Sequence, residues 1–209
     1  MDERIEIREF EKEDAEALSE IIRKTWNYDR FCSSETAIKM ARVYLYTCLC
    51  NQTYTRTALI NSKPVGIIMG KNVDKHRCKL DIRLKWLKSL FSLGLSKEGR
   101  RTMRMFGGID NLDEKMLKGL NKKYPGELSF FAIDSECRGH GIGRKLFEEL
   151  KLYMEGEGID EFYLFTDTSC NYKFYEHMGM RRCAEEDYTL HIADKSEKMT
   201  FFVYECSMA

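Results

Sequence analysis

The sequence predicts an α/β fold, because apolar runs of strand length alternate along the chain with longer stretches whose apolar residues recur at helical spacing. The clearest case lies between Glu127 and Leu150, where the strand-length run from Leu128 to Ile133 precedes three glycines and a helical pattern that begins near Arg144. The chain has only two prolines in 209 residues, which argues against long disordered linkers. A chain of this length can enclose one sizeable core, so we expect residues 1–209 to form a single domain.

The first half of the chain alternates strand and helix patterns. Ile5 and Ile7 alternate with charged residues, as in a half-buried strand, and Ser33 or Ser34 can cap a later helix. The polar stretch Asn61-Ser62-Lys63-Pro64 is typical of a hairpin turn between two strands. The elements expected in this half are a strand at 4–10, helices at 13–26 and 33–50, and strands at 56–60 and 65–71.

Between these strands and the glycine-rich segment, the pattern becomes mainly helical. Residues 78–86 would also suit an alternating strand, but the stripe of apolar residues from Leu80 to Phe91 continues past typical strand length, so we predict a helix. Further helices are expected at 97–106, ended by Gly107-Gly108, and at 111–122. The strands expected after the glycine-rich segment are 161–166, 182–192 and 199–206, with a turn at 193–197.

Charge is balanced over the whole chain, with 34 basic and 34 acidic residues, but the mainly helical segment is basic. From Lys71 to Pro125, fifteen Lys or Arg residues stand against six Asp or Glu residues. Such an excess is most often a solvated face, although it can also attract an anionic substrate or help to hold phosphates. Nucleic acid is a weaker candidate partner, because the segment has no recognisable nucleic-acid-binding motif.

Gly139, Gly141 and Gly143 lie between the predicted strand and helix. Three glycines in five residues remove the Cβ atoms that would keep a ligand away from the main chain, so several N–H groups can converge on an anion. The N-terminus of the following helix adds the positive end of its dipole. This combination predicts a site for a phosphate or pyrophosphate, with a spacing that is neither that of a dinucleotide-binding turn nor that of a P-loop.

Two motifs in this region resemble those of the GCN5-related N-acetyltransferase (GNAT) superfamily. The segment Arg138-Gly139-His140-Gly141-Ile142-Gly143 follows the R-x-x-G-x-G pattern of the superfamily's acyl-CoA pyrophosphate loop. The segment from Phe174 to Met180 is similar to its F-Y-x-x-x-G-F motif, with Met180 where phenylalanine is usual. Together with the strand between them, the resemblance covers about residues 127–183.

The resemblance implies a GNAT-type fold and reaction. The fold is a mixed, mainly antiparallel sheet of six to seven strands with helices on both faces, here with a helical insertion at about 74–124, between strands 3 and 4. Many members pass directly between these strands, so the insertion is a departure. An acceptor-site lid, an oligomer interface in a possible homodimer, and a structural elaboration are all open roles for it. The implied reaction moves an acetyl group from acetyl-CoA to a primary amine of a small molecule or peptide, by direct transfer in a ternary complex.

By the same resemblance, acetyl-CoA would lie along the end of the predicted strand. Ala132 and Ile133 would offer backbone groups to the pantetheine arm, as an added strand would pair with an edge. The phosphates would lie on the loop and first helical turn, formed by Arg138, Gly139, His140, Gly141, Ile142, Gly143 and Arg144. For the His140 side chain, a solvent-facing position is favoured over a catalytic role.

Two side chains are the candidates for proton transfer. Tyr175 stands at the tyrosine of the second motif, which in many members points its hydroxyl at the thioester sulfur, and a phenol can protonate a departing thiolate. The alternative for Tyr175 is a packed aromatic. Glu127 is similar in position to the base glutamate of the histone-acetylating branch, and its alternative is a solvated strand end. Asp134, Asp167 or a chain of waters could serve as the base instead.

No metal site is expected from the cysteines and histidines. The eight cysteines include no C-x-x-C pair and the four histidines complete no zinc-site spacing, so reduced thiols are the simplest interpretation. Cys170 lies five residues before Tyr175 but has no obvious activating base. Tyr28 and Phe31 lie in a loop where the superfamily's acceptor pocket is usually lined, with core packing as the alternative.

The sequence predicts a cytoplasmic protein without a membrane partner. Its N-terminus is charged from the second residue, unlike a signal peptide, and no stretch approaches the length of a membrane span. Two other functional classes remain open. One is a catalytically silent acyl-CoA-binding or sensing module, and the other is an interaction protein whose basic insertion docks an acidic partner or RNA.

Overall fold

A computed structural model describes residues 5–106, 109–192 and 195–208, so the expected positions Arg4, Gly107-Gly108 and Ala193-Asp194 lie outside the described residues. The described residues form one sheet of seven strands in the order β1-β2-β3-β4-β5-β7-β6. All neighbours are antiparallel except β4 and β5. This confirms the mixed, mainly antiparallel sheet. The strands are β1 (Ile5–Arg8), β2 (Tyr54–Ile60), β3 (Lys63–Asn72), β4 (Gly126–Ile133), β5 (Glu161–Asp167), β6 (Arg181–Ile192) and β7 (Lys195–Ser207).

Helices cover both faces of the sheet, as predicted. On one face, α1, α2 and α3 pack with residues of β3 and β4, and α5 packs with residues of β5 and β7. On the other face, α6 and α7 share a core with residues of β2 to β5 and β7. The helices are α1 (Ala15–Thr25), α2 (Ser34–Cys50), α3 (Leu80–Gly94), α4 (Lys97–Phe106), α5 (Ile109–Gly119), α6 (Ile142–Gly156) and α7 (Lys173–His177).

Local sequence explains several of the boundaries. Ser33 is the N-cap of α2, and its Oγ accepts a hydrogen bond from the N–H of Thr36 at 3.4 Å. The hairpin between β2 and β3 turns at Asn61 and Ser62, whose φ values of 49° and 64° are those of a tight type I′ turn. The expected four-residue turn was therefore too long. Lys63 and Pro64 belong to β3, where a bulge beside Leu59 accommodates the proline.

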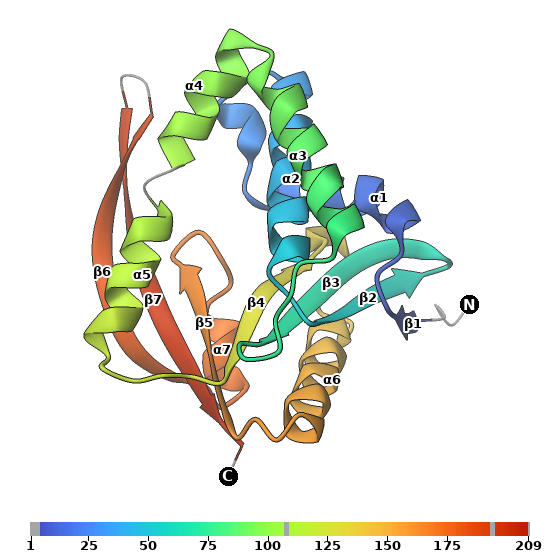
Figure 1. Cartoon of the computed structure of the whole chain (residues 1–209), viewed down its shortest axis with the longest axis vertical. Helices are drawn as coiled ribbons and strands as arrows, with labels where there is room; N and C mark the ends of the chain where they lie inside the picture. Colours follow the sequence, from blue (N-terminus) through green and yellow to red (C-terminus); the bar gives the residue numbers. More distant parts are fainter. Residues whose placement is uncertain (1–4, 107–108, 193–194, 209) are drawn as a thin grey trace.

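The strands β4 and β5 separate soon after they meet. They pair only through Gly126 with Phe162 and through Glu127 with Tyr163, although both strands continue for several residues. Each strand keeps its outer neighbour, since β3 pairs with β4 up to Ile133 and β7 pairs with β5 along its full length. A gap therefore opens in the middle of the sheet, with β4 and β5 as its two sides (Figure 1).

The predicted helical insertion between β3 and β4 is confirmed, and it spans this gap. Its first helix, α3, packs beside α2, and α4 contacts both of them. At the other end, α4 and α5 contact β6, and α5 also contacts β7 (Figure 1). The insertion thus connects the two halves of the sheet on one side of the molecule. This arrangement agrees with a lid over the gap, one of the three roles left open by the sequence.

A buried carboxylate ties the end of the insertion to the last hairpin. Glu205 on β7 accepts hydrogen bonds from the Tyr124 hydroxyl at 2.7 Å, the Lys122 ammonium at 3.2 Å and Nε of Arg181 at 3.0 Å. Burial alone would raise the pKa of Glu205, but these donors hold it below its ordinary value of 4.5, at about 2.

We predict that Glu205→Gln lowers the free energy of unfolding at pH 7 by about 1–3 kcal/mol. The pKa of Glu205 is lower in the folded than in the unfolded protein, so its contribution is complete above about pH 5 and is lost as the pH falls towards 2. Urea unfolding of the wild type and the variant should therefore differ more at pH 7 than at pH 3. An equal difference at both pH values would contradict the ionic origin of the effect.

Candidate active site

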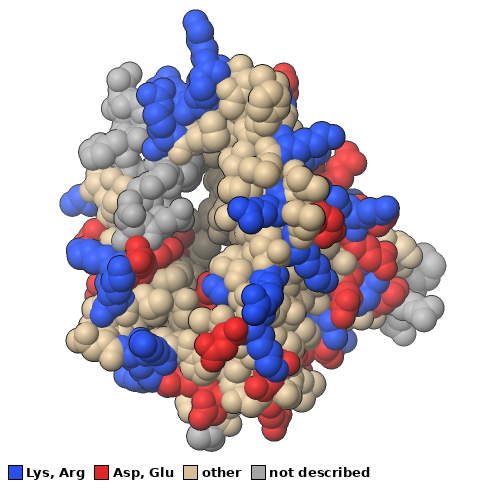
Figure 2. Space-filling view, in the orientation of Figure 1, with Lys and Arg blue, Asp and Glu red and all other residues tan. Residues whose placement is uncertain are grey.

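The gap between β4 and β5 forms the floor of the candidate site. Figure 2 shows the molecule hollowed between the side formed by α2 and α3 and the side formed by α5, β6 and β7. Beyond Glu127 and Tyr163, the inner edges of β4 and β5 have no strand partner among the described residues. Their backbone groups are open to an extended ligand that pairs as an added strand would.

A bulge in β4 lies where the gap begins. Met69 of β3 pairs with Phe130 and Gly70 pairs with Leu128, so Ser129 is the extra residue. A bulge bends its strand, and this one follows directly after the last pair between β4 and β5. Past the bulge, Ala132 packs on the α1 and α2 side, and Ile133 ends the strand on the α6 side.

The glycine loop after β4 adopts a conformation that requires glycine. Gly139 and Gly141 have φ values of 85° and 74°, in the left-handed region that other residues rarely adopt. Gly141 is the N-cap of α6 and offers no side chain to the helix, and the first turn contains no acidic residue. The N–H groups of that turn are therefore free of a side-chain cap and can bind an anion.

Basic side chains surround this loop. Arg138, His140 and Arg144 are exposed. The guanidinium of Arg138 donates to the carbonyl of Ile133 at 3.3 Å, at the base of the loop. Nδ1 of His140 lies 3.3 Å from the carbonyl of Cys137. Phosphate contacts of these residues stay predictions.

Phe174 joins the two sequence motifs in space, a role that the sequence did not predict. A Cβ atom at Gly143 would lie 3.2 Å from the side chain of Ile133 and 3.3 Å from that of Phe174, so glycine allows the helix start to approach both. The ring of Phe174 also lies 5.5 Å from that of Phe131 and 6.0 Å from that of Phe147. Gly143 was the available signal, because a third glycine inside a helix start indicates a close approach.

The structure buries Tyr175 in α7, near the end of β5. Burial raises its pKa, and the nearby Cys170 and Asp167 raise it further. The hydroxyl makes no hydrogen bond within the described part of the chain. A protonated phenol without a protein partner can donate to a ligand atom that reaches it.

Glu127 is buried rather than solvated, so the solvated strand end was the wrong alternative for it. It lies at the last pair before the gap, and its carboxylate accepts a hydrogen bond from Lys71 at 3.3 Å. Lys71 also donates to Asn51 at 2.7 Å, so the ammonium is fixed between two acceptors. A buried ion pair can have a purely structural role. It can also position a carboxylate at the edge of the gap, where the carboxylate could accept a proton.

The other two carboxylates considered as bases are both used in turns. Oδ1 of Asp134 accepts a hydrogen bond from the N–H of Glu136 at 3.1 Å. Oδ1 of Asp167 accepts one from the N–H of Ser169 at 2.6 Å. These bonds shape the loops that follow β4 and β5.

Cys170 lies near both Tyr28, in the loop between α1 and α2, and Tyr175. Burial raises the pKa of both Tyr28 and Tyr175, and the Cys170 thiol is close enough to raise both further. Burial and Asp167 in turn raise the pKa of Cys170 to about 11, so it is a protonated thiol at neutral pH. Tyr28 is buried, which agrees with core packing of its ring. It nevertheless lies close to Cys170. The sequence could not bring Tyr28 close to Cys170 and Tyr175, because Tyr28 lies far from both of them along the chain.

The comparison with protein families decides the identity of the fold. The acetyltransferase (GNAT) family matches residues 15–180, which is most of the chain. The chain belongs to the GNAT acetyltransferase family. The resemblance seen in the two motifs is thereby confirmed and extended from about residues 127–183 to the N-terminal helices.

Solved structures share the GNAT fold at low sequence identity. An N-acetyltransferase from Staphylococcus aureus is 14% identical, with a TM-score of 0.56 and 99% of each chain covered. The ribosomal-protein-S18-alanine N-acetyltransferase from Escherichia coli is 15% identical, with a TM-score of 0.54, and the match covers 99% of this chain and 96% of that one. The PaiA N-acetyltransferase from Thermoplasma acidophilum, in complex with coenzyme A, is 18% identical, with a TM-score of 0.51 and coverage of 98% and 99%. None of the curated protein sequences matches the chain.

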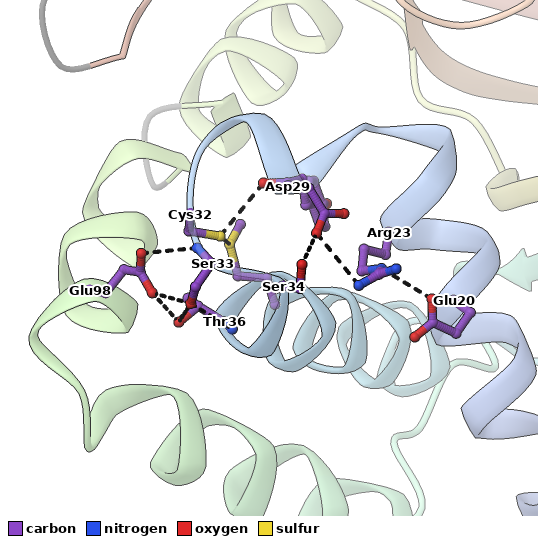
Figure 3. A network of polar contacts seen from close by, with 10 residues as sticks. Glu20, Arg23, Asp29, Cys32, Ser33, Ser34, Thr36 and Glu98 are labelled. Atoms are coloured by element: carbon purple, nitrogen blue, oxygen red, sulfur yellow. Dashed lines mark hydrogen bonds and ion pairs between the residues drawn. The ribbon is translucent and has the colours of Figure 1, made fainter.

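In this GNAT protein, the insertion also fixes the loop between α1 and α2. The carboxylate of Glu98 on α4 accepts hydrogen bonds from the Ser33 N–H at 3.0 Å, the Ser33 hydroxyl at 2.6 Å and the Thr36 hydroxyl at 2.5 Å (Figure 3). These donors hold the pKa of Glu98 below its ordinary value. Asp29 in the same loop accepts from the Ser34 hydroxyl at 2.7 Å (Figure 3). The loop that carries Tyr28 is thus held at both its middle and its end.

Neither a metal-binding cluster nor a membrane-spanning helix occurs among the residues that the structure describes. No group of His, Cys, Asp and Glu side chains in these ranges is arranged to hold a metal ion. None of the described helices has both the length and the apolar character that a membrane span requires.

Gly141 and Gly158 provide a matched test of the loop. Both have left-handed φ values, of 74° and 71°, and a Cβ atom at either would meet nothing within 4 Å. We predict that Gly141→Ala and Gly158→Ala each destabilise the protein by about 1 kcal/mol, while only Gly141→Ala weakens coenzyme A binding in calorimetry. Equal affinities in the two variants would show that the loop does not bind the phosphates.

Proposed function

We propose that this GNAT protein, acting as one domain over residues 1–209, transfers an acetyl group from acetyl-CoA to a primary amine of a small molecule or peptide. One observation carries the proposal: three features lie either at the gap or near the ends of the strands that border it. These are the open inner edges of β4 and β5, the uncapped N-terminus of α6 at one end of β4, and the Tyr175 hydroxyl beside the end of β5. The family and the coenzyme A complex of one neighbour support the choice of coenzyme.

Acetyl-CoA would bind along the open edge of β4. The diphosphate would bind at the loop from Gly139 to Gly143, where backbone N–H groups and the helix dipole favour an anion, with Arg138 and Arg144 beside it. The amide groups of the pantetheine arm would pair with the backbone of Ala132 and Ile133. The thioester would then lie in the gap, close to where α7 holds Tyr175.

The transfer would be direct, from thioester to amine in a ternary complex. The Cys170 thiol is the nearby candidate for a covalent intermediate, but a pKa of about 11 leaves almost none of it as the reactive thiolate at neutral pH. Binding both substrates in one gap converts a bimolecular reaction into an effectively unimolecular one. The protein then has to supply positioning, a base for the ammonium proton and an acid for the departing thiolate.

The assay that tests the proposal follows the release of free thiol from acetyl-CoA with a panel of amines and peptides. The proposal expects release that depends on an amine. If the protein binds acetyl-CoA but no amine or peptide stimulates release, the catalytically silent binding module becomes the better description. The panel also separates small amines from peptides as the acceptor.

Tyr175 is the proposed acid, and we predict that Tyr175→Phe lowers kcat about 100-fold in this assay while the affinity for acetyl-CoA is unchanged. Because its pKa is raised, the hydroxyl stays protonated past pH 10, and the wild type should lose no activity through Tyr175 as the pH rises to 10. Tyr172→Phe is the matched control, since Tyr172 is a nearby tyrosine whose ring packs in a tilted arrangement against Phe202, with the ring centroids 5.0 Å apart. Equal turnover in both variants at every pH would remove Tyr175 from the mechanism.

Glu127 is the proposed base, either directly or through a water molecule. Glu127 is buried at the last pair before the gap, so an amine bound in the gap would meet a carboxylate that is shielded from bulk water. The competing explanation is that the ion pair with Lys71 only holds β3 to β4.

A pair of variants separates these explanations. We predict that Glu127→Gln lowers kcat at least 10-fold, while Lys71→Met, which removes the ion pair but keeps the carboxylate, lowers kcat much less. Thermal unfolding of both variants measures the structural cost. If the two variants lose the same activity and the same stability, Glu127 acts only in the ion pair.

A further inference from the structure

The outer face of α3 carries large apolar side chains that nothing in the described structure covers. The side chains on this face are between 48% and 72% exposed, and they are Leu80, Leu84, Leu87, Phe91 and Leu95. Figure 2 shows uncharged surface over α3 with Lys and Arg side chains at its borders. Exposed apolar residues that occur singly need no explanation, but a continuous stripe along a helix of four turns indicates an interaction surface.

The stripe is not explained by packing within the chain, because α3 packs through its opposite face. Leu93 on that face is buried, and Trp86 packs against the core and donates from Nε1 to the Thr47 hydroxyl of α2 at 3.0 Å. The helix is therefore apolar on two sides. An amphipathic helix at a protein surface needs only one apolar side.

The spacing of the stripe is that of a helix that packs against another helix. Leu80, Leu84, Leu87 and Phe91 follow one another at intervals of four, three and four residues. These are the d-a-d-a positions of a heptad, which form the seam of a coiled coil. In that assignment, Asp81 and Lys88 occupy e positions and Arg83 occupies a g position.

These charges select the partner and its direction. In an antiparallel pair that places Leu80 opposite Phe91 and Leu84 opposite Leu87, each e position flanks an e position. Asp81 of one copy then lies beside Lys88 of the other, and the same contact occurs twice. In a parallel pair, each g position of one copy flanks an e position of the other. Arg83 of one copy would then lie beside Lys88 of the other, and these like charges would repel each other. The described residues provide no ion-pair partner for these three side chains within the chain itself.

We propose that α3 is the interface of a homodimer, in which two copies pair antiparallel about a two-fold axis midway between Leu84 and Leu87. The match between Asp81 and Lys88 favours a second copy over an anionic membrane surface, because the Asp81 carboxylate would be repelled by such a membrane while it completes the pair with Lys88. A seam of four helical turns is at the low end of stable interfaces, so the dimer dissociates on dilution. This inference does not depend on the proposed reaction.

The first test is sedimentation velocity of the full-length protein from about 1 to about 100 μM, the range in which a small interface dissociates. The wild type is expected to change from monomer to dimer across it. Leu84→Lys should remain monomeric at every concentration. Leu152→Lys is the matched control, because Leu152 on α6 is also exposed, at 63%, and lies outside the seam, so this variant should dimerise like the wild type. Circular dichroism confirms that both variants are folded.

The second test uses the charges to establish the direction of pairing. Lys88→Asp alone and Asp81→Lys alone should each weaken the dimer about tenfold, because each turns both attractive contacts into repulsions. The double variant D81K/K88D should restore it. In a parallel dimer, Lys88→Asp would instead strengthen the association by pairing with Arg83.

Three results would overturn the proposal. One is a wild type that stays monomeric up to about 100 μM, well above a micromolar dissociation constant. Another is a dimer that is unaffected by Leu84→Lys or strengthened by Lys88→Asp. The third is a monomer that binds vesicles of anionic phospholipid and loses that binding in Leu84→Lys, which would assign the stripe to a membrane surface.

Discussion

The structure depends on the separation of β4 and β5. Two pairs of residues join the strands, and beyond Glu127 the backbone groups on both inner edges lack a strand partner. Unpaired backbone groups are costly when they are shielded from water, so an open edge persists only where solvent or a ligand can reach it and where both strands are held elsewhere. Here β3 holds β4 and β7 holds β5 along their outer edges. The bulge at Ser129 bends β4 at the point where the gap begins.

A sheet that is divided in this way needs connections between its halves, and the insertion supplies them. It packs on α2 at one end and on β6 and β7 at the other. Part of its basic excess is used in these connections: Lys122 pairs with Glu161 and Glu205, and Lys115 lies 2.5 Å from Glu186. Glu98 fixes the start of α2 and the loop before it. The segment that departs from the simpler superfamily pattern therefore both supports the sheet and borders the candidate site.

The environment of the candidate site separates the roles of its ionisable groups. Burial keeps the Tyr175 hydroxyl and the Cys170 thiol protonated, so the first is suited to donate a proton and the second is unsuited to attack a thioester. Glu127, by contrast, is held against a fixed cation at the edge of the gap. The fold strengthens these properties, since burial raises the pKa values of Tyr175 and Cys170 above those of the isolated side chains, and the contact of Glu127 with Lys71 exists only in the folded chain.

The sequence by itself determined the features that depend on neighbouring residues. Strand and helix periodicity, the cap at Ser33, the choice of helix for α3 and the glycine loop with its positive φ values all follow from contacts within a few residues. The tertiary structure alone decided which distant residues meet: Phe174 against Gly143, Lys71 against Glu127, and Glu98 against the start of α2. It also decided that β7 lies between β5 and β6. Such contacts depend on how whole elements pack, and local spacing carries no information about the distance between elements.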